Sequence, residues 1–483
     1  MNIARRASSL VLLVAAILAD AQANGGLQDE KLTTLADQQE VAVTIYNDDL
    51  GLVKDARKVK LDRGANRLAW REVSAHMRPE TALVRNLSDP DGFRLIEQNF
   101  DFDLLTPQKL LEKYVGKAVT VITTNPATGV ERREAATLLA SNGGVVLKFA
   151  DRIETGLPGR LAFSGVPENL RDQPTLVISL ISSRTGDQNL ELSYLTGGLS
   201  WKADYVAELN GTDDRLDMNG WVTLTNQSGA SYPNARLQLV AGDVNRVREE
   251  LMSPRALPMM AKAAMAGAQE MTQENLFEYH LYTLQQPTTI AENQTKQVAL
   301  MTAQSIPVRK EFLLQGANYY YSGQYAELGQ KIKVGVFVEF DNKGEGLGIP
   351  LPKGIVRVYK KDAKGNAQFV GEDRIDHTPK NETVRLRLGD AFDITANRKQ
   401  TDFRKVSGTS RYNYVYESAY QITIKNAKSE PITVKVAEPM PGDWQILSES
   451  LPHTKAASGM AVWQVPVAAE GSTVLTYRAQ VRY

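Results

Sequence analysis

Four side chains that could transfer a proton or bind a cation lie within six positions of one stretch, Val370–Lys380. They are Glu372, Asp373, Asp376 and His377. A general acid or base works beside a group in the opposite protonation state, so Asp373 or Asp376 with His377 as its partner forms a candidate catalytic site. Neighbouring residues of an extended chain point to opposite faces, and the turn predicted at Thr378–Asn381 would let these side chains converge.

A structural interpretation of the same stretch competes with the catalytic one. In it, Asp376 and His377 hold the turn through bonds to the backbone, and Glu372 and Asp373 end the preceding strand in solvent. We favour this interpretation because no other motif in the sequence completes a site. The competing hypothesis is a glycan- or peptidoglycan-directed hydrolase that uses Asp373, Asp376 and His377. A carboxylate pair for glycosidic hydrolysis could also include Asp390 or Asp393.

Metal and cofactor motifs are missing from the sequence. The four histidines are not spaced as a zinc pair, cysteine is absent, and neither a G-x-S-x-G turn nor a phosphate-binding P-loop occurs. We therefore predict no cofactor. Calcium is an open alternative because it binds carboxylate oxygens, although the spacing matches no EF-hand loop. The calcium candidates are Asp341, Glu345, Asp373 and Asp376.

Residues 1–23 have the pattern of a secretory signal peptide. Arg5 and Arg6 precede the apolar run Leu10–Ala19, which is too short to cross a bilayer, and small residues up to Ala23 offer cleavage sites. An exported chain of 483 residues without cysteine is typical of the bacterial periplasm. A formal net charge of zero argues against nucleic acid as a partner, and the mature chain has no membrane-spanning segment. We predict a periplasmic or secreted bacterial protein.

Strand patterns dominate the chain and must position these side chains. Residues alternate between the two faces over Lys331–Phe340 and Thr383–Leu388, and Lys364–Asn366 predicts a hairpin turn after a strand over Ile355–Lys360. Thr106–Tyr114 predicts a single short helix, with Thr106 as its cap. The spacing of strands and turns is typical of tandem immunoglobulin- or fibronectin-like sandwiches, preceded by an N-terminal β domain with a small barrel-like insertion.

The predicted domains follow from these patterns. They are a signal peptide (1–23), an N-terminal β domain (24–190, with the barrel-like insertion at about 106–165), a first sandwich (191–310, with a mobile Met- and Ala-rich insertion at 250–275) and a C-terminal sandwich (311–483).

Three long stretches resemble a known family. They are "SYLTGGLSWKADYVAEL", "GWVTLTNQSGASYPNARLQLVAGDVN" and "LGIPLPKGIVRVYKKDAKGNAQFVGEDRIDHTPKNETVRLRLGDAFDI". From about Val41 to the C-terminus the chain resembles the bacterial exported proteins of the domain of unknown function 4139 (DUF4139), and it is distantly similar to mucoidy-inhibitor-like proteins. The resemblance implies export and a β-rich structure, and it carries over no catalytic residue.

A non-catalytic binding or scaffold role in the cell envelope is the function that we expect. β-sandwiches that have polar loops and no assembled catalytic site usually bind other molecules rather than catalyse a reaction. The expected partner is an envelope protein or a glycan. The loops Asp341–Gly354 and Glu372–Lys380 and the Met-rich insertion are the candidate contact surfaces. A further alternative is an outer-membrane-associated β protein, because the C-terminal "TVLTYRAQVRY" alternates like the final strand of a membrane barrel.

Overall fold

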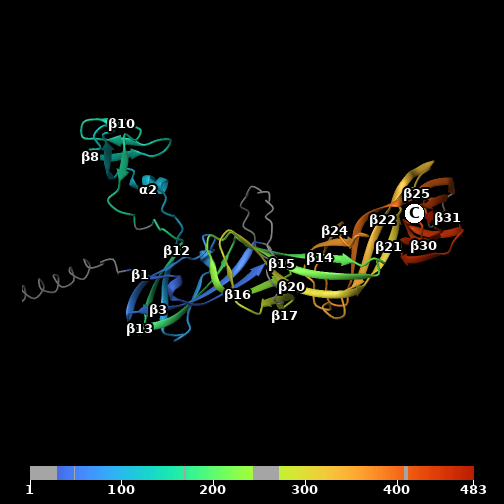
Figure 1. Cartoon of the computed structure of the whole chain (residues 1–483), viewed down its shortest axis with the longest axis horizontal. Coiled ribbons are helices and arrows are strands. Elements are labelled where there is room, and N and C mark those ends of the chain that lie inside the picture. Colours follow the sequence, from blue (N-terminus) through green and yellow to red (C-terminus); the bar gives the residue numbers. More distant parts are fainter. Residues whose placement is uncertain (1–29, 48, 168–169, 243–270, 407–411) are drawn as a thin grey trace, which may run out of the picture. The chain divides into compact units, whose positions relative to one another are not determined.

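The structure is a computed structural model, and it describes residues 30–47, 49–167, 170–242, 271–406 and 412–483 (Figure 1). The predicted signal peptide and residues 250–270 of the predicted Met-rich insertion lie outside the described residues. Strands make up most of the described chain and confirm the predicted mostly β fold class. Within these ranges, no helix is both long and apolar enough to cross a membrane.

The chain divides into two compact units. The first comprises Met1–Trp201, Leu224–Val240 and Gln286–Lys296, and the second comprises Lys202–Thr223, Ala241–Gln285 and Gln297–Tyr483. The chain therefore changes unit several times.

Two sheets form the main body of the first unit. One has the strand order β1-β4-β12-β6, and in the other β16, β2, β3, β13 and β5 follow one another, with β19 paired to β16. The elements are β1 (Lys31–Thr33), η1 (Leu35–Asp37), β2 (Gln38–Tyr46), β3 (Leu50–Leu61), β4 (Gly64–Arg71), η2 (Pro79–Thr81), β5 (Leu83–Asn86), β6 (Phe93–Asp101), β12 (Thr175–Ser182), β13 (Gly186–Thr196), β16 (Tyr232–Ala241) and β19 (Thr288–Ile290).

A small helix-and-sheet element, here called the insertion module, lies between β6 and β12 in the sequence. It consists of α2 (Pro107–Tyr114), β7 (Ala118–Thr124), β8 (Glu131–Ala140), β9 (Val146–Lys148), β10 (Ile153–Thr155) and β11 (Arg160–Ala162), with the strand order β10-β9-β8-β7-β11 (Figure 1). The predicted helix is confirmed, because Lys109 N donates to Thr106 Oγ1 over 3.1 Å and Pro107 occupies the first helical position. Tyr114 of α2 packs into a core with Val121, Leu138 and Leu147.

The second unit includes a five-stranded sheet in the order β20-β15-β14-β23-β24, as well as the hairpin of β17 and β18. Its strands are β14 (Leu199–Leu209), β15 (Arg215–Asn226), β17 (Met271–Leu276), β18 (Tyr279–Leu284), β20 (Gln294–Pro307), β23 (Gly354–Lys361) and β24 (Ala367–Ile375). The predicted hairpin is confirmed: β23 pairs antiparallel with β24, and Gly365 takes the left-handed conformation that the turn requires (φ +83°).

A nine-stranded sheet forms the C-terminal part of the second unit, in the order β28-β31-β26-β25-β22-β21-β27-β30-β29. Its elements are β21 (Arg309–Gln315), η3 (Asn318–Tyr321), β22 (Glu327–Asp341), β25 (Thr383–Val406), β26 (Val415–Asn426), β27 (Ile432–Pro439), β28 (Asp443–Glu449), β29 (His453–Ala457), β30 (Met460–Val467) and β31 (Ser472–Arg482). The strands predicted from alternation are thus confirmed within β22 and β25.

This sheet curls over a single core. The edge strands β28 and β29 are consecutive in the chain and separated only by residues 450–452, so the two edges must lie near each other. Trp463 of β30 and Tyr477 of β31, which approach opposite edges in the strand order, stack with their ring centroids 4.6 Å apart. Inside the curl, Arg398 Nη2 donates to Glu438 Oε1 over 2.6 Å, and both side chains are almost fully buried.

Candidate functional site

The structure places Glu372 and Asp373 on β24 and uses both carboxylates in structural contacts. Asp373 Oδ1 accepts from the backbone N–H of Arg374 (2.8 Å), and Oδ2 accepts from that of Arg387 on β25 (2.7 Å). Glu372 forms an ion pair with Arg357 Nε (3.2 Å), and the same guanidinium donates to the buried Asp204 (2.9 Å). These contacts tie β24 to its neighbouring strands.

Asp376 and His377 lie just after β24. The side chain of Asp376 is exposed, and its backbone carbonyl accepts from Thr378 Oγ1 (2.8 Å). His377 Nδ1 accepts from the backbone N–H of Lys353 (3.2 Å), a contact of the kind that the structural interpretation predicts. The predicted turn forms one residue later, where Glu382 N donates to Pro379 O (3.4 Å). The catalytic role of Asp373, Asp376 and His377 stays a prediction.

Asn342 holds the two predicted contact loops together. Its buried side-chain amide donates to Ile349 O (2.7 Å) and Pro379 O (3.0 Å), and its Oδ1 accepts from Gly348 N (3.1 Å). One residue from the loop Asp341–Gly354 thus bonds to both loops. Leu351 in the same loop is 1% exposed, so much of this surface belongs to the core.

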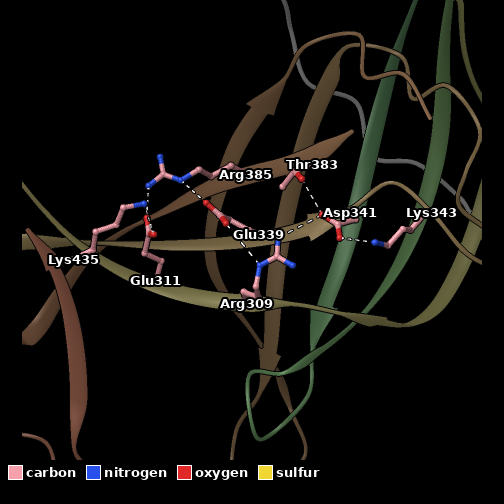
Figure 2. Close-up of polar contacts among 8 residues, drawn as sticks. All are labelled: Arg309, Glu311, Glu339, Asp341, Lys343, Thr383, Arg385 and Lys435. Atoms are coloured by element: carbon pink, nitrogen blue, oxygen red, sulfur yellow. Dashed lines mark hydrogen bonds and ion pairs between the residues drawn. The ribbon is translucent and has the colours of Figure 1, made fainter. Parts of the chain in front are cut away.

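The calcium candidate Asp341 belongs to a row of charges that crosses β27, β21, β22 and β25 (Figure 2). This row, here called the charge ladder, alternates in sign and consists of Lys435, Glu311, Arg385, Glu339, Arg309, Asp341 and Lys343, with Thr383 donating to Asp341. Its shortest ion pairs are Arg385 Nη2 to Glu311 Oε1 (2.7 Å), Lys435 Nζ to Glu311 Oε2 (2.8 Å) and Arg385 Nε to Glu339 Oε1 (2.8 Å).

Two acids of the ladder, Asp341 and Glu311, have lowered pKa values and stay ionised at neutral pH. Hydrogen bonds from Lys343, Thr383 and Arg309 lower the pKa of Asp341 to about 2. Burial opposes ionisation of Glu311, but hydrogen bonds from Lys435 and Arg385 outweigh it and lower the pKa of that carboxyl. Glu345 lies outside the ladder, on an exposed turn. In the part of the chain that the structure describes, no three acidic or histidine side chains are grouped so that they could hold a metal ion.

An open apolar groove of about 460 Å³ lies beside α2 in the insertion module. Its lining residues are Leu105, Thr106, Pro107, Leu110, Leu111, Leu157, Leu161 and Phe163. Three of these residues lie on one face of α2, at positions i, i+3 and i+4. Leu110, Leu111, Leu161 and Phe163 also pack against the module's core, so the groove has a fixed floor.

The rim of the groove stays exposed although it is apolar. Leu105 and Leu157 keep 40% and 49% of their surface in solvent, and elsewhere on the module Val130 and Ile153 are more than 60% exposed. Contiguous apolar surface that stays exposed is a feature of protein interaction sites. The sequence analysis did not predict the groove. Its leucines come from separate stretches of the sequence, and no local pattern distinguishes an exposed leucine from a core leucine.

Charged side chains lie on α2 and just before it in the chain. Lys109 and Lys113 on the solvent side of α2 both form ion pairs with Asp103, at 3.4 and 3.0 Å, and Lys109 also pairs with Glu112 (3.3 Å). The two cations and two acids of this group pair with one another, so the group carries no net charge.

Comparison with known proteins gives one family. A family model described as a domain of unknown function (DUF4139) matches residues 190–483. No curated protein matches the chain. The predicted likeness to mucoidy-inhibitor-like proteins stays a prediction. Because the matched region covers more than half of the sequence, from β13 to the C-terminus, the chain belongs to the DUF4139 family.

Proposed function

We propose that this protein is an exported, non-catalytic binding protein of the bacterial cell envelope, and that the groove of the insertion module binds an apolar segment of a partner protein. The groove is the observation that carries the proposal. Two of the candidate carboxylates, Asp373 and Glu372, contact a backbone amide and an arginine, whereas the groove leaves leucine side chains open to solvent. An exposed apolar surface that is supported by a packed core is suited to bind a ligand rather than to catalyse a reaction.

A protein segment suits this groove better than a sugar does. Six of its eight lining residues are leucine or phenylalanine, and Thr106 Oγ1, the polar side-chain atom in the lining, already caps α2. A glycan needs several hydrogen-bond partners, which this lining does not supply. An amphipathic helix presents apolar side chains at i, i+3, i+4 and i+7, and its polar flanks can pair with Lys109 and Glu112 on α2, which carry opposite charges.

Site-specific photo-crosslinking tests this proposal. A photoreactive amino acid at position 157 should give a discrete adduct with one envelope protein in cells, and the same amino acid at the exposed position 139 of the module should not. In the cross-linking protein, Leu105→Asp should abolish the adduct, because a carboxylate in the groove repels an apolar ligand.

Leu139→Asp is the matched control, because Leu105 and Leu139 are both 40% exposed and belong to the same module. Equal adducts from positions 157 and 139, or equal loss with the two Asp variants, would contradict the groove as the binding site. Export has its own check, since N-terminal sequencing of the secreted fraction should find a mature chain that begins near residue 24.

A further inference from the structure

The insertion module is attached to the main body of the first unit at one place. Among the described residues, no hydrogen bond, ion pair or ring contact links residues 106–165 to the strands of that body. The links run instead through residues 102–105, which lead from β6 to α2, and through the residues just before β12. The module also has its own core around Leu138 and Leu147. A part with one attachment and its own core can change its orientation without unfolding.

Backbone hydrogen bonds hold the two connecting segments side by side at this attachment. Leu104 forms an isolated parallel bridge with Arg171. The backbone N–H of Leu105 donates to the carbonyl of Arg171 (2.7 Å), and the N–H of Arg171 donates to the carbonyl of Asp103 (3.0 Å). The chain therefore enters and leaves the module through adjacent segments, and a few residues at such a point are enough to form a hinge.

The side chain of Arg171 ties this attachment to three strands of the main body. Its Nε donates to Asp101 Oδ2 at the end of β6 (2.9 Å). Its Nη1 and Nη2 donate to Oε1 and Oε2 of Glu30 (2.6 and 3.0 Å), a bidentate pair that the planar guanidinium is well shaped to form. Glu30, which immediately precedes β1, also accepts from Arg67 Nε on β4 (3.2 Å). We call Glu30, Arg67, Asp101 and Arg171 the Arg171 latch.

We propose that the Arg171 latch holds the insertion module in one orientation, and that the module turns as a rigid arm when the latch opens. The side chains of Arg171 and Glu30 are only 17% and 21% exposed, so their attraction is screened less than that of a surface pair. The hydrogen bond from Arg171 is the main cause of the lowered pKa of Glu30, so this carboxylate is ionised and the latch is closed at neutral pH. Opening the latch would change the direction in which the α2 groove faces.

Electron paramagnetic resonance distances between two nitroxide labels on the full-length mature protein test the proposal. The chain has no cysteine, so Leu139→Cys in the module and Lys54→Cys on β3 give two specific labelling sites, both exposed. We expect one narrow distance distribution in the otherwise unchanged protein, and a distribution at least twice as wide with Arg171→Gln. Arg236→Gln is the control, because Arg236 also pairs with a glutamate of the first unit but joins β16 to β2, and it should leave the width unchanged.

Hydrogen exchange of the same variants separates orientation from stability. With Arg171→Gln, amide protection in α2 and β8 should stay as in the wild type; a loss of protection there would mean that Arg171 stabilises the fold of the module, and it would overturn the proposal. If Arg171→Gln does not fold, Glu30→Gln opens the same latch from the other side. An unchanged width in the folded latch variants would also overturn the proposal. The distances are measured without a ligand, so the result does not depend on whether the α2 groove binds a partner.

Discussion

The buried ion pair between Arg398 and Glu438 allows a stability prediction of defined size. Glu438 is 0% exposed and accepts from Arg398 Nη2 (2.6 Å) and from the Tyr321 hydroxyl (3.2 Å). The substitution Glu438→Gln keeps the shape but leaves the guanidinium without its counter-charge inside the core. Removing one partner of a buried pair typically destabilises a protein by about 3–5 kcal/mol. At about 2–4 °C per kcal/mol, the melting temperature of the second unit should fall by about 6–20 °C.

A double substitution separates the loss of a contact from the burial of an unpaired charge. Arg398→Met with Glu438→Leu removes both charges, and Tyr321 keeps its hydrogen bond to the Tyr477 hydroxyl (2.9 Å). The double variant should be more stable than Glu438→Gln alone, because replacement of a buried pair by apolar side chains is often nearly neutral. Thermal unfolding should be followed with hydrogen exchange of β25 and β27 peptides, which confines the readout to this sheet.

The pH dependence gives the refuting result. Burial raises the pKa of Glu438 above its ordinary value, although Arg398 opposes the shift, so the folded state takes up the proton before the unfolded state does. The deficit of Glu438→Gln should therefore be smallest at neutral pH and grow as the pH falls through this raised pKa, because the wild type gains stability when Glu438 takes up a proton and the Gln variant does not. The reasoning would be refuted if the free energies of unfolding of Glu438→Gln and the wild type differed by less than about 0.5 kcal/mol at pH 7. A difference of that size is usual for substitutions on the surface.

Three further predictions concern other sites. Because the pKa of Asp341 is lowered to about 2, its contribution to stability is present above about pH 4 and is lost between pH 4 and 2, so urea midpoints of Asp341→Asn should change less over that window than those of the wild type. Thr106→Ala removes the cap of α2 and should destabilise the insertion module by about 1 kcal/mol, seen as faster hydrogen exchange in α2 but not in β13. Asp376→Asn should leave the melting temperature and any envelope phenotype unchanged; a folded variant without the phenotype would instead support the hydrolase hypothesis.

The strands that could be predicted are those in which local pattern and tertiary environment agree. In β22 the alternation around Val334, Val338 and Phe340 matches a face that the core buries, and in α2 the cap and first-turn proline act locally. The tryptophans show the limit of such reasoning. A tryptophan on a sandwich strand is usually a core residue, but of Trp201, Trp221, Trp444 and Trp463 only Trp201 and Trp463 are buried, because exposure depends on which neighbours a strand receives.

The groove and the aromatic contacts near the C-terminus depend on tertiary structure that no local pattern contains. Leu105 and Leu157 line the same groove although they are far apart in the sequence, and the ring of Tyr416 contacts those of Phe403 and Tyr483. A leucine or tyrosine on a strand is usually a core residue, so the sequence gives no reason to expect it in solvent. The acidic stretch around Asp376 is the opposite case. Its residues are neighbours in the sequence and so suggest a site, but in the structure they contact different partners.

The strand order of the nine-stranded sheet also affects how quickly the protein can fold. β21 pairs in parallel with β27, where Phe312 meets Val434, and β31 inserts between β26 and β28, so the last strand joins both. Such long-range pairings require large loops to close before any contact compensates for the lost entropy, and they slow folding. The sheet cannot be completed until β31 has emerged from the ribosome. This delay keeps the nascent chain extended for longer, which is compatible with the export proposed above.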